Sequence, residues 1–92
     1  MNSKRLDCNG KIIKEGDIII YNSCDGNSKG NYFTGIVYYN VLYCSFLIQT
    51  EYFNDEFTPF LWVKVIDNIK NHKGRNNDEI LEIYKDEWKK YE

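Results

Sequence analysis

The sequence predicts a mainly β fold with one C-terminal α-helix, built as a small barrel or as a strongly curled antiparallel sheet. Two patterns predict this class. Short β-branched and aromatic runs alternate with clusters of Gly, Asn, Asp and Ser up to about residue 70, and apolar residues then recur at helical spacing. The 92 residues, 16% of them aromatic, supply one small core, so we expect a single domain over residues 1–92.

Two glycine turns frame the first β elements. Asn9-Gly10 and Glu15-Gly16 contain residues that tolerate positive φ, which a tight chain reversal requires. Between the turns, residues 12–13 predict a short extended piece, and a strand is expected over 17–21. Residues 22–31 are dense in turn formers and therefore predict a long polar loop.

The middle of the chain predicts a hairpin. Strand-forming residues fill 32–39, and Gly35 inside them indicates a bulge or a close backbone crossing. Asn40 supplies the turn, and residues 41–50 predict the second strand. So short a connection predicts that the two strands pair as neighbours. Residues 51–56 are expected to form a connector.

A last strand and a helix complete the predicted fold. The strand is expected over 57–66, with Pro59 at its entry because proline has no N–H for an inner ladder. The β-module thus covers about residues 6–70, and the helix about 77–91. Asn76 or Asn77 is a good N-cap for this helix. Its apolar face combines four residues at helical spacing: Ile80, Tyr84, Trp88 and Tyr91.

Charge and cysteine usage limit the function classes. A formal charge of −2 does not favour a protein that neutralises nucleic-acid phosphates. Residues 16–69 hold two lysines and six acids, which would suit a basic partner surface or would keep the protein soluble. Three cysteines without a CxxC pair fit a reducing cytoplasm. We expect no metal, no cofactor and no membrane span.

Three segments carry a family resemblance. Residues 7–19 read DCNGKIIKEGDII and resemble the signature of YopX-like proteins of phages and prophages, which runs close to DxNGxxIxEGDIV. Residues 63–69 (VKVIDNI) are similar to the closing strand and turn of that family, and 35–37 (GIV) to an internal strand. Asp67 stands where the family mostly has Gly, and the helix is outside the match.

The resemblance to YopX-like proteins has consequences for the fold and the origin of the chain. It implies a small SH3-like β-barrel, a phage origin and possible homo-oligomers. It implies no defining chemistry, and fold analogy alone does not supply a function.

Aromatic residues on the outward faces of two predicted strands form the first candidate binding surface. Tyr43, Phe60 and Trp62 would lie there and would anchor a partner protein or stack on a base. The alternative is that the C-terminal helix covers this face with its own apolar stripe. The sequence leaves both interpretations open.

Charged segments form two further candidate surfaces. Tyr52, Asp55 and Glu56 in the acidic connector would meet a basic partner surface. A cluster of three basic residues before the helix would bind an anion beside the helix N-terminus. This anion-binding cluster consists of Lys70, Lys73 and Arg75.

No catalytic constellation stands out in the sequence. His72, the only histidine, is expected to be solvated in a polar loop, without a nucleophile close to it in sequence. Turn acids such as Glu15, Asp17 and Asp67 usually bond to their own backbone. We therefore expect that the protein is not an enzyme.

The sequence and the resemblance together predict a phage-encoded, non-enzymatic module in the host cytoplasm that inhibits or sequesters a host component. The target would be a CRISPR or other anti-phage complex, or a signalling nucleotide. For a nucleotide, Tyr43 and Trp62 would stack on the base and the anion-binding cluster would hold the phosphate. The alternatives are a nucleic-acid-binding phage accessory protein and a structural oligomer.

Overall fold

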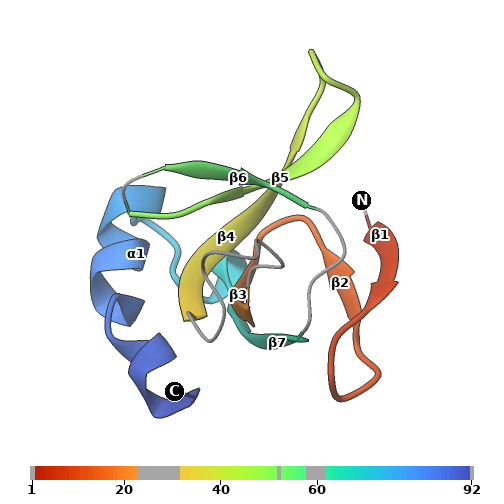
Figure 1. Cartoon of the computed structure of the whole chain (residues 1–92). Coiled ribbons are helices and arrows are strands. Elements are labelled where there is room, and N and C mark those ends of the chain that lie inside the picture. The colour runs from red at the N-terminus through yellow and green to blue at the C-terminus, as the bar shows by residue number, and fades with distance from the viewer. Residues whose placement is uncertain (1, 23–31, 52, 58–61, 92) are drawn as a thin grey trace.

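The computed structural model describes residues 2–22, 32–51, 53–57 and 62–91 and shows a mainly β fold (Figure 1). Five strands form one antiparallel sheet in the order β6-β5-β4-β3-β7, and two others form a separate ribbon. The strands are β1 (Asn2–Leu6), β2 (Ile12–Lys14), β3 (Asp17–Asn22), β4 (Tyr32–Asn40), β5 (Ser45–Gln49), β6 (Asn54–Glu56) and β7 (Trp62–Asn68). One short helix, α1 (Asn77–Tyr84), lies between two 3₁₀ segments, η1 (Ile69–Asn71) and η2 (Glu87–Tyr91).

The predicted class, a mainly β chain with an antiparallel sheet and a C-terminal helix, is confirmed. Over the described residues β6 and β7, the two edge strands, do not pair with each other, so the sheet is open. The strands expected over 12–13, 17–21 and 32–39 are present as β2, β3 and β4, each one residue longer at its C-terminal end.

Several predicted boundaries in the rest of the β-module are wrong. The strand expected over 41–50 begins at Ser45, because the four residues before it form the hairpin tip. The expected connector contains β6, whose polar sequence has no strand pattern but whose backbone pairs with β5. The last strand is described over Trp62–Asn68 and therefore ends two residues later than predicted. Residues 23–31 of the predicted loop, and 58–61, lie outside the described part.

The C-terminal helix is also shorter than predicted. The side chain of Asn76 accepts a hydrogen bond from the N–H of Glu79, which confirms Asn76 as the N-cap, but α1 ends at Tyr84. The segment η2 then continues in 3₁₀ geometry, where side chains at i and i+3 line up. Nζ of Lys89 lies 3.2 Å from Oδ1 of Asp86, which forms an ion pair at i,i+3 spacing.

The central strands β3 and β4 pack on both faces, and each face has its own core. The larger core joins the sheet to β2 and consists of Ile13, Ile19, Tyr21, Val37, Ile48, Val63 and Val65. On the opposite face α1 contributes Ile80 and Leu81, which pack against Ile18 and Ile36. The C-terminal segment therefore covers this face, as one of the two sequence interpretations predicts.

The turn at Asp7 covers the outer edge of β7. The N–H of Cys8 donates to the carbonyl of Val63, at 2.8 Å, and the Asp7 carboxylate accepts from the N–H of Val65, at 2.9 Å. The same carboxylate accepts from the N–H of Lys11 within its own turn. Burial would raise the pKa of Asp7, but these N–H donors hold it below its usual value. Asp7 therefore protects a sheet edge that would otherwise be open.

Carboxylates also fix the turn at Glu15-Gly16 by accepting hydrogen bonds. One carboxylate oxygen of Asp17 accepts from the N–H of Lys14 and the other from the side-chain amide of Asn68, at 2.9 and 2.8 Å. The carboxylate of Glu15 accepts from the N–H of Tyr39, at 3.0 Å. The acids of both turns thus bond to the protein's own backbone and amide groups, so this stretch is structural scaffold.

Candidate functional site

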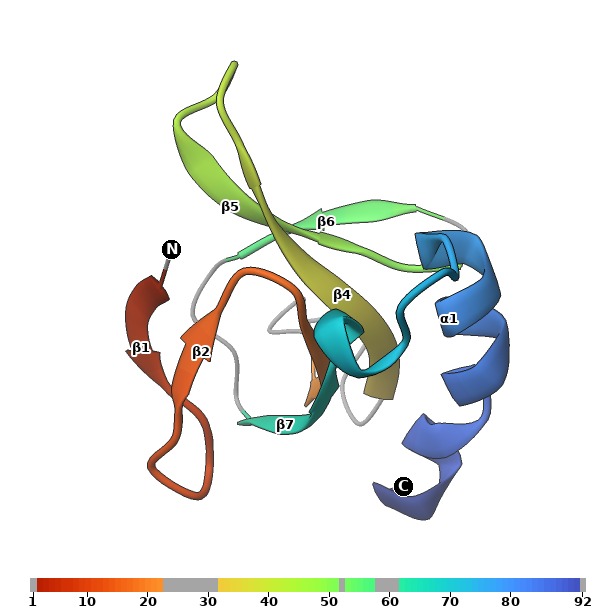
Figure 2. The ribbon, with the colours of Figure 1, turned by 180° about the vertical axis from the view of Figure 1, so that it is seen from behind.

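The tip of the β4–β5 hairpin is the most exposed apolar feature among the described residues. Val41, Leu42 and Tyr43 are 75%, 87% and 72% exposed. The hairpin projects beyond the rest of the sheet in both opposite views (Figures 1 and 2). Hairpin tips are normally built from polar turn formers, and an exposed apolar group rimmed by polar residues indicates an interaction site.

Local hydrogen bonds fix the conformation of this tip. Oδ1 of Asn40 accepts from the N–H of Leu42 and of Tyr43, at 2.9 and 3.2 Å, which forms an Asx turn. Cys44 then adopts a φ of 49°, in the left-handed region, and returns the chain to β5 at Ser45. Because the loop is ordered by its own contacts, a partner would not have to order it on binding.

Ring contacts support the stem of the hairpin below the tip. Tyr39 and Phe46 pair across β4 and β5, with ring centroids 5.2 Å apart. Phe46 in turn contacts Phe57 at 6.0 Å, and the guanidinium of Arg5 lies 4.6 Å from the Phe57 centroid. These contacts connect the stem of the hairpin to β1, so the strands below the tip are packed against the rest of the protein.

The structure separates two of the aromatic residues that the sequence assigned to one surface. Tyr43 lies at the tip, whereas Trp62 begins β7 and packs against Tyr91, with ring centroids 5.1 Å apart. The tip and β7 lie at opposite ends of the sheet in Figures 1 and 2. Tyr43 and Trp62 therefore do not form one stacking site. Tyr52 and Phe60 lie outside the described residues.

The acidic candidates lie on the edge strand β6. The carboxylate of Asp55 accepts a hydrogen bond from the hydroxyl of Tyr21, at 3.1 Å. Tyr21 is fully buried, and this burial, followed by the nearby Asp55 charge, raises its pKa. The side chain of Asp55 thus bonds to a core residue, while the backbone of Glu56 pairs with Leu47. Charge reversal at Asp55 would disturb folding and any binding together.

The predicted anion-binding cluster is exposed, but acidic side chains already complement the positive N-terminal end of α1 beside it. Lys70, Lys73 and Arg75 lie on the surface around η1 and the following turn. Asp78 and Glu79 occupy the first turn of α1, where they complement the positive end of the helix dipole. These acids would repel a bound anion, so the geometry does not strengthen this candidate.

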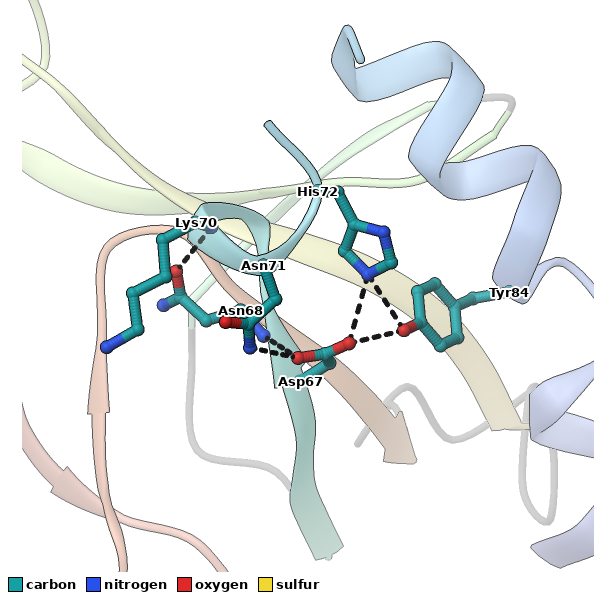
Figure 3. Close-up of polar contacts among 6 residues, drawn as sticks. All are labelled: Asp67, Asn68, Lys70, Asn71, His72 and Tyr84. Carbon is teal, nitrogen blue, oxygen red and sulfur yellow. Dashed lines mark hydrogen bonds and ion pairs between the residues drawn. The ribbon is translucent and has the colours of Figure 1, made fainter. Parts of the chain in front are cut away.

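A polar cluster centred on Asp67 joins β7 to η1 and α1 (Figure 3). The carboxylate accepts from the Tyr84 hydroxyl at 2.5 Å, from the Asn71 amide at 2.7 Å and from the N–H of Asn68 at 2.8 Å. Nε2 of His72 lies 3.0 Å from both Asp67 Oδ2 and the Tyr84 hydroxyl oxygen. The expectation that His72 is a solvated loop residue is therefore wrong, since its ring is half-buried and paired.

The protonation behaviour of this cluster points to a structural role. Hydrogen bonds from Tyr84 first, and then from Asn71, hold the pKa of Asp67 well below its usual value. Burial, followed by the hydrogen bond to Asp67, raises the pKa of Tyr84 to about 12. A carboxylate that stays ionised and a phenol that stays protonated are poorly matched to proton transfer near pH 7. We interpret the cluster as a structural element whose hydrogen bonds hold α1 against the sheet.

The described residues contain no group of three or more His, Cys, Asp or Glu side chains arranged to hold a metal ion. No helix in this part of the chain is long and apolar enough to cross a membrane.

Comparison with protein-family models, with curated proteins and with solved structures finds no match for this chain.

The sequence interpretation included Tyr43 but missed its two neighbours. The β propensity of Val41 and Leu42 predicts a strand, whereas both residues lie in the hairpin tip. The available signal was Asn40, whose side chain can cap the next N–H groups and keep the following apolar residues in the loop.

Proposed function

We propose that this protein is a non-enzymatic binding module that inserts its β4–β5 hairpin tip into an apolar pocket of a partner protein. The observation that carries the proposal is the exposure of Val41, Leu42 and Tyr43 on a projecting loop that is ordered by its own hydrogen bonds. Binding hot spots are typically such anchors, with aromatic residues enriched among them.

The apolar side chains that the tip exposes are large enough to support a specific interaction when a partner buries them. Removing a Leu or Val side chain from water contributes roughly 1.5–3 kcal/mol, and each 1.4 kcal/mol changes the dissociation constant about tenfold. Leu42 is almost fully exposed and Val41 and Tyr43 largely so, which makes most of this free energy available to a partner.

The target that we propose is a host protein. The resemblance of residues 7–19 and 63–69 to YopX-like proteins supports a phage origin and, with it, an SH3-like barrel and action in the host cytoplasm. Occupying a component of a CRISPR or other anti-phage complex would need binding alone, without chemistry. The net negative charge of residues 16–69 favours a target with a basic surface around the apolar pocket.

Affinity purification from the host with quantitative mass spectrometry tests this proposal. The wild-type protein is compared with Leu42→Asp, which places a charge at the tip, and with Ile83→Asp as the matched control. Ile83 is also an exposed apolar residue, at 46%, but it lies on α1. Thermal melting of all three proteins is the control for folding.

We expect a host protein that copurifies with the wild type and the Ile83 variant and is depleted with Leu42→Asp. The same copurifying proteins with all three chains would contradict the tip as the binding site. If Leu42→Asp instead converts an oligomer into a monomer and depletes no host protein, the tip is a self-association surface and the proposed target is wrong.

A further inference from the structure

A second surface, beneath the C-terminal segment, combines aromatic and polar side chains in two rows across the sheet. In the first row Asn22 on β3 pairs with Tyr32 on β4 and with Trp62 on β7. In the second row Ile20 lies between Thr34 and Lys64. Cross-strand partners and residues at i and i+2 point to the same face, so both rows share one face.

Two oxygen atoms in these rows are buried without a hydrogen-bond partner. Asn22 is 6% exposed and Thr34 is 8% exposed, and neither Oδ1 of Asn22 nor Oγ1 of Thr34 has a partner in the structure. They are the two such side-chain atoms found among the described residues. Buried polar groups are normally satisfied, so a pair on adjacent strands in one face calls for an explanation.

The segment η2 covers this face through ring contacts. The ring of Tyr91 lies 5.1 Å from that of Trp62, which also contacts Tyr32 edge-on at 5.7 Å. The ammonium group of Lys64 lies 5.4 Å from the centroid of Tyr91. No residue of η2 is fully buried, and Lys90 pairs within the segment with Glu87. The ring of Tyr91 thus lies close to both the Trp62 indole and the Lys64 ammonium group.

We propose that this face is a mononucleotide site and that Tyr91 occupies the place of the base in the present conformation. A purine would stack on Trp62 in place of the Tyr91 ring. The amino group of adenine, or the amino and N1–H groups of guanine, would supply donors that Asn22 Oδ1 and Thr34 Oγ1 lack. Lys64 would then pair with the phosphate.

The chemistry favours a single nucleotide over a nucleic-acid strand. One indole platform and one lysine match one base and one phosphate, and the overall charge of −2 opposes the binding of a polyanionic strand. This site lies away from the hairpin tip, so it does not depend on the function proposed for the tip. It also differs from the stacking site predicted from sequence, because neither Tyr43 nor the anion-binding cluster takes part.

Titration of the full chain with AMP and GMP, followed by calorimetry and by backbone amide NMR, tests the assignment. We expect saturable binding that shifts the amide signals of 20–22, 32–34 and 62–64. Tyr91→Ala should tighten binding about threefold to tenfold, since an aromatic contact no longer competes with the base. Asn22→Leu should weaken binding about tenfold without lowering the melting temperature, because the leucine removes a buried unpaired oxygen.

A second pair of variants separates phosphate recognition from base recognition. Lys64→Gln should weaken AMP binding and leave adenosine binding unchanged, whereas Lys14→Gln, at an exposed lysine on β2 outside the site, should change neither. The absence of saturable binding to both the wild type and Tyr91→Ala would overturn the proposal. Binding that Asn22→Leu leaves intact, or a short single strand that binds more tightly than AMP, would overturn it as well.

Discussion

Replacing Gly35 with alanine tests the packing that holds the hairpin on the sheet. A Cβ atom at this position would approach Cγ2 of Ile48 to well under 3.0 Å and the carbonyl oxygen of Gln49 to 3.1 Å. Ile48 is fully buried, so it has little room to move. Overpacking of this kind costs about 2 kcal/mol, which lowers the melting temperature of a domain of this size by about 8–16 °C. The assay is thermal unfolding followed by circular dichroism.

Two further variants make this prediction specific. Ile48→Leu removes the Cγ2 methyl while keeping the side-chain volume, so the double variant with Gly35→Ala should recover much of the lost stability. Gly74→Ala is the control: its φ is +86° but no atom lies within 4 Å of the new Cβ, so it should cost only backbone strain, about 1 kcal/mol. A Gly35→Ala protein that melts within about 2 °C of the wild type, or strictly additive effects in the double variant, would refute the reasoning.

Three other predictions concern the polar cluster and the tip. The pKa of Asp67 is depressed on folding, so the ionised carboxylate stabilises the fold above its ordinary pKa of 3.8, and this stabilisation is lost as the pH falls. Asp67→Asn should therefore lower the free energy of unfolding, measured with denaturant, by about 1–2 kcal/mol at pH 7. Below pH 3.8 the free energies of unfolding of the wild type and the variant should approach each other. Cys44→Gly should raise the free energy of unfolding by about 0.5–1 kcal/mol, since glycine adopts the left-handed φ of 49° without strain; an unchanged value would count against strain there. Asn40→Ala should increase hydrogen–deuterium exchange at the amides of Leu42 and Tyr43, and unchanged protection of these amides would contradict the Asx turn.

The parts of the fold that the sequence predicts are those set by local rules. Gly35 within a strand pattern predicts a bulge or a close crossing, and the continuous register around it shows a close crossing with Ile48. Asn76 caps the helix, and Asp17 bonds to the backbone of its own turn. In each case neighbouring residues and their hydrogen-bonding groups decide the conformation.

The errors arise where distant contacts decide the outcome. β6 has no apolar alternation and forms because β5 offers a free edge. His72 resembles a loop histidine until β7 and α1 bring Asp67 and Tyr84 to its ring. The two buried oxygen atoms of Asn22 and Thr34 are defined only by cross-strand pairing and by the cover of η2, which no local pattern describes.

The affinity of the hairpin tip for the captured partner tests the central claim most directly. Leu42→Ala removes an anchor worth about 2 kcal/mol, so the dissociation constant measured by calorimetry should rise about 30-fold, whereas the melting temperature should stay unchanged because Leu42 is 87% exposed. Ile83→Ala, on α1, should leave the affinity unchanged. An equal affinity of the wild type and Leu42→Ala for the same partner would contradict the proposal that this protein binds through the tip.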